Sequence, residues 1–298
     1  LQAATRETLS FYIDVPANAT NLVIATSGGS GDVDLYTRHG QQPTDSLYDC
    51  RPYAGGNAET CTEAAPAQGR WYVDLQLILK LRIIVTRYGS KTIQIEDWDE
   101  QYHSKHGAVQ EAYHVVIEHG LRLFADQRVH ILEIGFGTGL NALITYLEAP
   151  KLNVTIDYVG VEAFPVSMEE AISLDYGKQL DLKGSNAIFE RLHSCPWDER
   201  FDISDDFVLT KQKKDFRDIQ DQNLFNLIYF DAFGARVQPE LWTEEVFSIM
   251  FKALKSGGVL VTYAAKGSVR RAMQAVGFSV ERLPGPPGKR EMLRGIKE

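Results

Sequence analysis

The segment Ile131-Leu-Glu-Ile-Gly-Phe-Gly-Thr-Gly-Leu-Asn141 decides the fold of the second half of the chain. An apolar run from Val129 to Ile134 ends at glycines and is followed by a helical pattern from Leu140 to Leu147. Glycines at the end of a strand let the backbone turn sharply and approach a ligand closely. The segment therefore predicts a nucleotide site at the carboxyl edge of a sheet.

The sequence on both sides of this segment alternates between helices and strands. Helical spacing covers residues 107–124, and further apolar strands are expected at Tyr158–Glu162, Leu224–Phe230 and Gly258–Tyr263. This alternation predicts an α/β domain with a mostly parallel, doubly wound, Rossmann-like sheet.

The glycine spacing and the acids beside it distinguish between two nucleotide cofactors. Dinucleotide sites usually show Gly-x-Gly-x-x-Gly, whereas the third glycine here comes one residue early and Glu133 precedes the turn. The pattern resembles class I methyltransferases, which implies that Gly135, Gly137 and Gly139 bind S-adenosylmethionine and that Glu162 bonds its ribose. A carboxylate suits a ribose because two hydroxyl donors meet two acceptor oxygens. The alternative is an ordinary glycine-rich turn with a solvated Glu162.

Two further acids follow predicted strands. Asp231 comes directly after the run Leu224–Phe230, so it is expected at the same carboxyl edge. There it can orient an attacking amine or offset positive charge during transfer, or it can simply cap the strand. Asp215 follows the predicted third strand, where an acid often meets adenine in this class, and it is the weaker cofactor-binding candidate.

A narrower resemblance covers the chain from about residue 80 onward. It is carried by the blocks Asp99–Glu111, Leu132–Asn141, Val161–Pro165, Asp231–Phe233 with Leu241-Trp242, Thr262-Tyr263 with Val269–Arg271, and Gly288–Leu293. These blocks resemble the methyltransferase part of the MnmC type, the tRNA wobble-uridine modifying enzymes. The resemblance implies that Tyr102, Ser104 and Glu111 close over the cofactor. It also implies that Gly135 to Asn141 hold the cofactor and that Asp231 faces the reacting amine.

The reaction implied by this resemblance is methyl transfer to the primary amine of 5-aminomethyl-2-thiouridine at the tRNA wobble position. In bifunctional family members a separate flavin domain prepares this amine, and we expect no flavin here. The alternatives are a small-molecule amine methyltransferase, an aminopropyltransferase, or an exported binding protein with an inert methyltransferase-like scaffold.

The first 78 residues follow a different pattern. Short strands with alternating or β-branched residues are expected at Thr8–Val15, Asn21–Thr26, Val33–Thr37 and Arg70–Leu75. Loops rich in Gly, Pro and Asn separate them, which is typical of an antiparallel β-sandwich.

The motifs of this half resemble the bacterial pre-peptidase C-terminal domain. They are Val15–Leu22, Ser27–Tyr36, Tyr48–Tyr53 and Glu59–Cys61. That family consists of small β-sandwiches attached to secreted hydrolases, which implies a binding or maturation module. Here Leu77–Leu81 replaces further sheet-forming sequence, so we expect an incomplete sandwich at residues 1–78 and the methyltransferase domain at 79–298. A hairpin is expected next, with strands Leu81–Thr86 and Lys91–Ile95 and a turn at Tyr88–Ser90.

Charge and composition restrict the partners. The formal net charge of −9 argues against binding nucleic acid by overall charge, so tRNA binding would depend on local clusters. The basic tail, Lys289, Arg290, Arg294 and Lys297, is the cluster that favours tRNA. No stretch approaches about 18 consecutive apolar residues, and we expect no membrane partner. No metal site is predicted, because four ligands at metal spacing are absent.

The two halves differ in the compartment that they suggest. Cys50 and Cys61 bracket a turn-rich loop, which is consistent with a disulfide in an oxidising compartment and also with two free thiols. The first half resembles secreted modules, whereas a tRNA methyltransferase is expected in the cytoplasm.

Overall fold

The computed structural model describes residues 3–28, 32–44, 46–52, 54, 56–85, 91–95, 100–102, 107–180, 184–236 and 238–298. The chain divides into two compact units, and each is described here by itself. The N-terminal unit comprises Leu1–Arg82 and Gln94–Glu100, and the C-terminal unit comprises Ile83–Ile93 and Gln101–Glu298. Because the chain passes between the units more than once, a single boundary near residue 78 stays a prediction.

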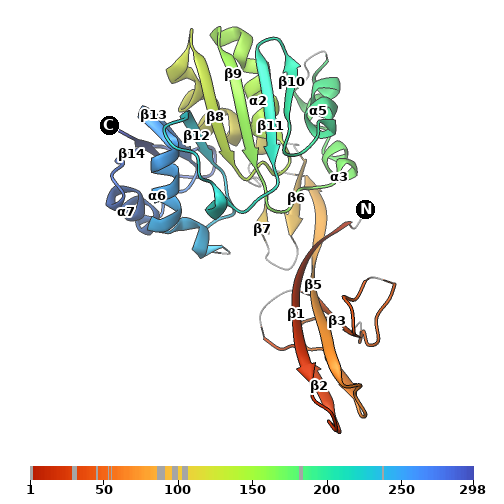
Figure 1. The fold of residues 1–298 in the computed structure, drawn as a ribbon. Helices are drawn as coiled ribbons and strands as arrows, with labels where there is room; N and C mark the ends of the chain where they lie inside the picture. The colour runs from red at the N-terminus through yellow and green to blue at the C-terminus, as the bar shows by residue number, and fades with distance from the viewer. Residues whose placement is uncertain are drawn as a thin grey trace. The chain divides into compact units, whose positions relative to one another are not determined.

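The N-terminal unit is built from antiparallel strands, as its sequence predicts (Figure 1). The strands are β1 (Ala3–Val15), β2 (Leu22–Ala25), β3 (Asp32–His39), β4 (Thr60–Glu63) and β5 (Gly69–Val85). Strand β5 pairs with both β1 and β3, so it lies between them, and β2 pairs with β4 in a second sheet. Strand β4 was missed because its four residues follow a loop without any apolar alternation.

Strand β5 is longer than the sequence predicts. We expected two strands, Arg70–Leu75 and Leu81–Thr86, but the structure has one unbroken strand from Gly69 to Val85. Its register with β1 runs from Val15 opposite Gly69 to Ala3 opposite Leu81. The continuous partner strand supplies ladder hydrogen bonds across the stretch where we expected a break. Thr86 and the predicted turn at Tyr88–Ser90 lie outside the described residues, and β6 (Lys91–Ile95) is confirmed.

The side chains that the structure describes in the N-terminal unit include one buried apolar cluster. Leu35, Cys61 and Val73 form a buried cluster, with Leu35 fully inaccessible. On β1, in contrast, Leu9 and Phe11 are 51% and 53% exposed, although they lie opposite Leu75 and Val73 of β5. Apolar burial therefore stabilises the β3 and β5 side of the sheet more than the β1 side.

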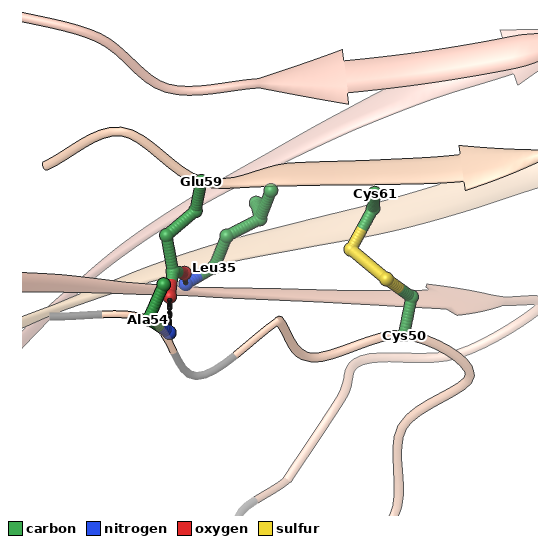
Figure 2. Close-up of a disulfide and its surroundings, with 5 residues drawn as sticks. All are labelled: Leu35, Cys50, Ala54, Glu59 and Cys61. Carbon is green, nitrogen blue, oxygen red and sulfur yellow. Dashed lines mark hydrogen bonds between the residues drawn. A yellow bond between two sulfur atoms is a disulfide. The ribbon is translucent and has the colours of Figure 1, made fainter.

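A disulfide and a buried carboxylate hold the loop that follows β3 (Figure 2). Cys50 and Cys61 are bonded, with an S–S distance of 2.14 Å, which decides between the two alternatives for this pair. The carboxylate of Glu59 accepts hydrogen bonds from the backbone N–H groups of Leu35 and Ala54, at 2.5 and 2.6 Å. The carboxylate of Glu59 thus connects the buried strand β3 to the loop residue Ala54.

The C-terminal unit contains an eight-stranded sheet in the order β10-β11-β9-β8-β12-β13-β15-β14. Its strands are β8 (Arg128–Ile134), β9 (Thr155–Val161), β10 (Arg200–Ser204), β11 (Phe207–Gln212), β12 (Phe225–Phe230), β13 (Leu254–Thr262), β14 (Ser279–Pro284) and β15 (Glu291–Ile296). The strands from β11 to β13 in this order are parallel, and β10, β15 and β14 are antiparallel to their neighbours. This confirms the mostly parallel sheet of a class I methyltransferase fold.

Helices connect the strands. They are α1 (Ala108–Ala112), α2 (Leu140–Glu148), α3 (Met168–Ser173), α4 (Tyr176–Gln179), α5 (Ser185–Ser194), α6 (Glu244–Ala253) and α7 (Gly267–Ala275). The short turns are η2 (Tyr113–Glu118), η3 (Leu121–Phe124), η4 (Ala149–Leu152), η5 (Phe216–Asp218) and η6 (Pro239–Trp242). The helix predicted over 107–124 is thus an α-helical, a π-helical and a 3₁₀ segment in succession. Among the described residues, no helix is both long and apolar enough to cross a membrane.

Side-chain alternation on the central strands buries both faces of this sheet. On β12, Ile228 and Phe230 pack in the cluster that contains Phe247 of α6. The next residue on the other face, Tyr229, places its hydroxyl 3.3 Å from that of Thr145 in α2. Helices on both faces leave the carboxyl edge of the parallel strands as the place for a ligand.

Replacing both Cys50 and Cys61 with serine is expected to lower the free energy of unfolding of the N-terminal unit by roughly 2–3 kcal/mol, because the disulfide restricts the unfolded chain. Urea unfolding without reductant measures the change. Alkylation of the denatured, unreduced wild-type protein should modify one thiol, that of Cys195, and prior reduction should raise the number to three. Three modified thiols without reduction would contradict the disulfide.

Candidate active site

The glycine turn between β8 and α2 is built so that only glycine fits it. Gly135, Gly137 and Gly139 have φ angles of 86°, 50° and 70°, in the left-handed region that favours glycine. A Cβ atom at Gly135 would lie 2.9 Å from the backbone oxygen of Asp231, a distance that real Cβ atoms essentially never show. The turn after β8 and the segment after β12 therefore approach each other at backbone level.

Glu162 directly follows β9 and faces the glycine turn. One carboxylate oxygen accepts the N–H of Gly137 and the other accepts the N–H of Phe164, both at 3.0 Å. Burial raises the pKa of Glu162, and the backbone donors partly offset this effect. Each carboxylate oxygen has a second lone pair, so the side chain can still accept hydrogen bonds from two adjacent hydroxyls.

Asn141 connects two acids across neighbouring strands. Its side-chain amide donates to Glu133 at 2.9 Å and to Asp231 at 2.8 Å, and Tyr158 donates to the other oxygen of Glu133 at 2.8 Å. Glu133 is 1% exposed and Asn141 is 3% exposed. The structure places these two residues behind Asp231, and contact of Glu133 or Asn141 with the cofactor stays a prediction.

Asp231 lies at the carboxyl end of β12, where its sequence position places it. Its environment raises its pKa to about 7, first through burial and then through the negative charge of Glu111. The hydrogen bond from Asn141 and the charge of Lys289 act in the opposite direction. A carboxyl group with a pKa near neutral pH is suited to accept a proton during a reaction.

A small pocket opens beside Asp231. Its lining includes Glu111, Asn141, Asp231 and Tyr263 together with the apolar side chains of Val115, Val116 and Val261. Glu111 comes from α1, and its carboxylate accepts a hydrogen bond from the ammonium of Lys289. That ammonium also lies 3.7 Å from the ring centroid of Tyr263. The pocket thus combines carboxylates with an aromatic face.

Tyr102 covers the glycine turn from outside the sheet. A Cβ atom on Gly137 would lie 3.1 Å from its ring, and the ring is in edge contact with Phe233 at a centroid distance of 4.9 Å. Burial, followed by the charge of Glu162, raises the pKa of the Tyr102 hydroxyl, which stays protonated. Ser104 lies outside the described residues.

Two family models match the chain. Residues 199–298 match S-adenosyl-L-methionine-dependent methyltransferases, and residues 7–76 match the bacterial pre-peptidase C-terminal domain. The chain carries an S-adenosyl-L-methionine-dependent methyltransferase domain. Residues 7–76 carry the pre-peptidase C-terminal domain.

Related proteins extend the match of the methyltransferase domain. The chain is 29% identical over 216 residues to the tRNA 5-methylaminomethyl-2-thiouridine biosynthesis bifunctional protein MnmC of Hydrogenovibrio crunogenus, covering 66% of this chain and 31% of that protein. It is 30% identical over 218 residues to the protein of the same name from Idiomarina loihiensis, covering 66% of this chain and 36% of that protein. The chain therefore spans about a third of the length of these relatives.

A solved structure shows the same fold. The crystal structure of MNMC2 from Aquifex aeolicus aligns with a TM-score of 0.58 and 23% sequence identity, covering 73% of this chain and 70% of that chain. The comparison supports the architecture of the methyltransferase domain, and the roles of individual residues rest on the geometry described above.

The residues at this edge fit the cofactor of the family. At Gly135 a Cβ atom would collide with the backbone of Asp231, so only glycine lets the turn lie this close to the segment after β12. Glu162 stands beside the turn with lone pairs to spare for a ribose. Glu162 would thus hold the ribose of S-adenosylmethionine next to the glycine turn.

Asp215 lies apart from this cluster of contacts. It follows β11 and caps η5, and its carboxylate accepts hydrogen bonds from the backbone and guanidinium N–H groups of Arg217. Arg217 holds the pKa of Asp215 below its usual value. Contact between Asp215 and adenine therefore stays a prediction.

The basic tail does not form one surface. Lys289 is bonded to Glu111 inside the methyltransferase site, Arg294 pairs with Glu281 at 2.6 Å, and Lys297 donates to the backbone of Leu254 at 2.7 Å. The part that Lys289 and Tyr263 play in the pocket was missed, although both lie in blocks that carry the family resemblance. Lys289 was assigned to tRNA because its neighbours in the sequence are basic.

Replacing Glu162 with alanine is expected to weaken S-adenosylmethionine binding roughly 10- to 100-fold, the range for losing hydrogen bonds to a charged group. Isothermal titration of wild type and variant measures the change. Glu169→Gln is the matched control, because Glu169 is an exposed acid seven positions further along the chain. Equal dissociation constants for the Glu162 variant and wild type would remove Glu162 from the cofactor site.

The raised pKa of Asp231 predicts how stability depends on pH. Well below pH 3.8 the carboxyl group is protonated in both folded and unfolded chains, but between its usual pKa of 3.8 and about 7 the folded chain alone keeps the proton. Stability should therefore fall across this window as pH rises, by up to about 4 kcal/mol relative to Asp231→Asn. Urea unfolding of both proteins from pH 4 to 8 checks this. A difference in unfolding free energy that stays constant with pH would show that the pKa of Asp231 is not raised.

Proposed function

We propose that the methyltransferase domain methylates the primary amine of 5-aminomethyl-2-thiouridine at the wobble position of tRNA. The main support for the proposal is Asp231. It is an acid with a pKa near neutral pH, and it lines the small pocket. The names of the curated relatives supply the acceptor, since they make the 5-methylaminomethyl nucleoside.

The chemistry requires a neutral amine. S-adenosylmethionine supplies an electrophilic methyl group on a sulfonium, and Gly135, Gly137 and Glu162 would hold it. An alkylammonium has no lone pair, so Asp231 first accepts one proton from it and becomes a neutral acid. The amine lone pair then forms the N–C bond as the S–C bond breaks. The product is a secondary ammonium, and its positive charge replaces that of the sulfonium.

The protein contributes position and charge to this step. The amide of Asn141 fixes Asp231, so the carboxylate does not need to reorganise when the amine arrives. Holding the two reactants in line can supply much of the rate enhancement. No covalent intermediate on the protein is needed.

Exposed cations near the same edge support a polyanionic substrate. Lys266 is the N-cap of α7, which follows β13, Arg271 lies in the middle of this helix, and Arg290 lies in the loop before β15. All three are exposed, and none is ion-paired within the part of the chain that the structure describes. These three cations are the proposed contacts to tRNA phosphates, and Arg290 is the one member of the basic tail among them. They act locally despite the net charge of −9.

The proposal also covers compartment and cofactors. We place the methyl transfer in the cytoplasm, where tRNA is found, and we assign no flavin chemistry to this chain. The Cys50–Cys61 disulfide favours an oxidising compartment for the N-terminal unit, since cytosolic thiols are kept reduced. The two units thus differ in the environment that suits them.

Incubating the full chain and S-adenosylmethionine with tRNA that carries 5-aminomethyl-2-thiouridine should yield the methylaminomethyl nucleoside, detected by mass spectrometry of the digest. Asp231→Asn should lower kcat by about 10²–10⁴, because the variant cannot take the proton. The Glu169→Gln variant is the control and should match wild type. A wobble nucleoside of unchanged mass with wild-type protein would refute the proposal. Comparable kcat/KM on small amines alone would assign the enzyme to small-molecule acceptors.

A further inference from the structure

We infer that Glu111, Asp231 and Tyr263 form a subsite for a primary ammonium group, and that Lys289 fills this subsite while no acceptor is bound. The inference deepens the proposed function and rests on it for the identity of the acceptor. The contacts of Lys289 carry the inference, because they show that Glu111 and Tyr263 bind an alkylammonium, and Asp231 lines the same pocket.

Lys289 makes the two contacts by which proteins usually hold an ammonium ion. Its Nζ atom donates to Glu111, and it lies 3.7 Å from the ring centroid of Tyr263. A carboxylate offers a charge-assisted hydrogen bond, and the face of an aromatic ring attracts a cation through its quadrupole. An acceptor with the same terminal group could make both contacts in place of the lysine.

The walls of the subsite are fixed by structural elements. Glu111 belongs to α1, and Tyr263 follows β13 with its hydroxyl donating to the backbone of Ala232 at 2.8 Å. Asp231 is held by Asn141. An incoming group therefore meets walls that are already in place, which limits the entropy lost on binding.

Lys289, which occupies the subsite, belongs to a loop. Lys289 lies between β14 and β15, in a turn where its N–H donates to the backbone of Pro286 at 2.9 Å. Its side chain is 32% exposed, compared with 11% for Glu111. The flexible lysine stem can rotate toward solvent without disturbing the sheet or α1.

The charges and walls suit an ammonium on a short apolar stem. Glu111 and Asp231 both line the pocket, and the charge of Lys289 offsets part of their mutual repulsion. Val115, Val116 and Val261 supply apolar surface next to them. A primary ammonium has three N–H donors and can bond both carboxylates, whereas a quaternary ammonium has none.

Removing the occupant should expose the subsite to added amines. Lys289→Ala is melted in methylammonium chloride, and in sodium chloride and tetramethylammonium chloride at equal ionic strength, without tRNA or cofactor. At saturating methylammonium the melting temperature of the variant should rise about 2–4 °C above its value in sodium chloride. Wild type should show no such difference, because its own lysine fills the subsite. A variant that responds to methylammonium no more than wild type would overturn the inference.

Two further variants keep the test decisive. Lys289→Met retains most of the side-chain volume, and it replaces the alanine variant if that protein does not fold. The double variant Lys289→Ala with Glu111→Gln should lose the response to methylammonium, because the carboxylate that binds the ammonium is gone. Arg290→Ala removes the neighbouring exposed cation and, like wild type, should melt at the same temperature in methylammonium chloride as in sodium chloride. A response that persists in the double variant would place the amine elsewhere.

This experiment is separable from the test of methyl transfer. Methylammonium binding to Lys289→Ala without methylation of tRNA would support the subsite and refute the tRNA acceptor. Methylation of tRNA without any ammonium response in the Lys289 variants would support the proposed function and overturn the subsite.

Discussion

The single amide group of Asn141 holds two buried carboxylates in place, and the arrangement of the methyltransferase site depends on this interaction. Glu133 and Asp231 end neighbouring strands of the sheet, and both accept from the same NH₂ group. Without that donor, two like charges would be buried close together at a cost of several kcal/mol. Helix α2 brings Asn141 to this point because it begins immediately after the glycine turn. The glycine turn, helix α2 and Asp231 are therefore connected through the side chain of Asn141.

The sequence predicted the features of this construction that are local. The strand, the glycines and the helix adjoin in the chain, and Glu162 and Asp231 each follow an apolar run directly, so periodicity and position were sufficient. The contact between Lys289 and Glu111 joins residues 178 positions apart, and no local pattern marks it. The predicted length of strand β5 was wrong for a related reason. Its length is set by pairing with β1 rather than by its own composition. Long-range pairing decides such features, and a single sequence does not display it.

The two units are stabilised in different ways. The N-terminal unit has a small apolar cluster, and a disulfide and a bonded carboxylate organise its long loop. Small domains commonly need such crosslinks because they bury too little apolar surface. The C-terminal unit instead buries both faces of a large sheet, and its cysteine is free and inaccessible to solvent. Reducing conditions should therefore affect the first unit and leave the second intact.

The position of Lys289 has a consequence for selectivity among cellular amines. Lys289 is part of the same chain as the proposed ammonium subsite, so it competes for that subsite at a high effective concentration. A free amine must displace it in order to bind. Small amines bring little binding energy beyond their ammonium group and would rarely succeed. An amine attached to a macromolecule that also contacts Lys266, Arg271 and Arg290 brings binding energy from outside the pocket. Competition by Lys289 would therefore reduce methylation of free small amines, and less S-adenosylmethionine would be consumed on them.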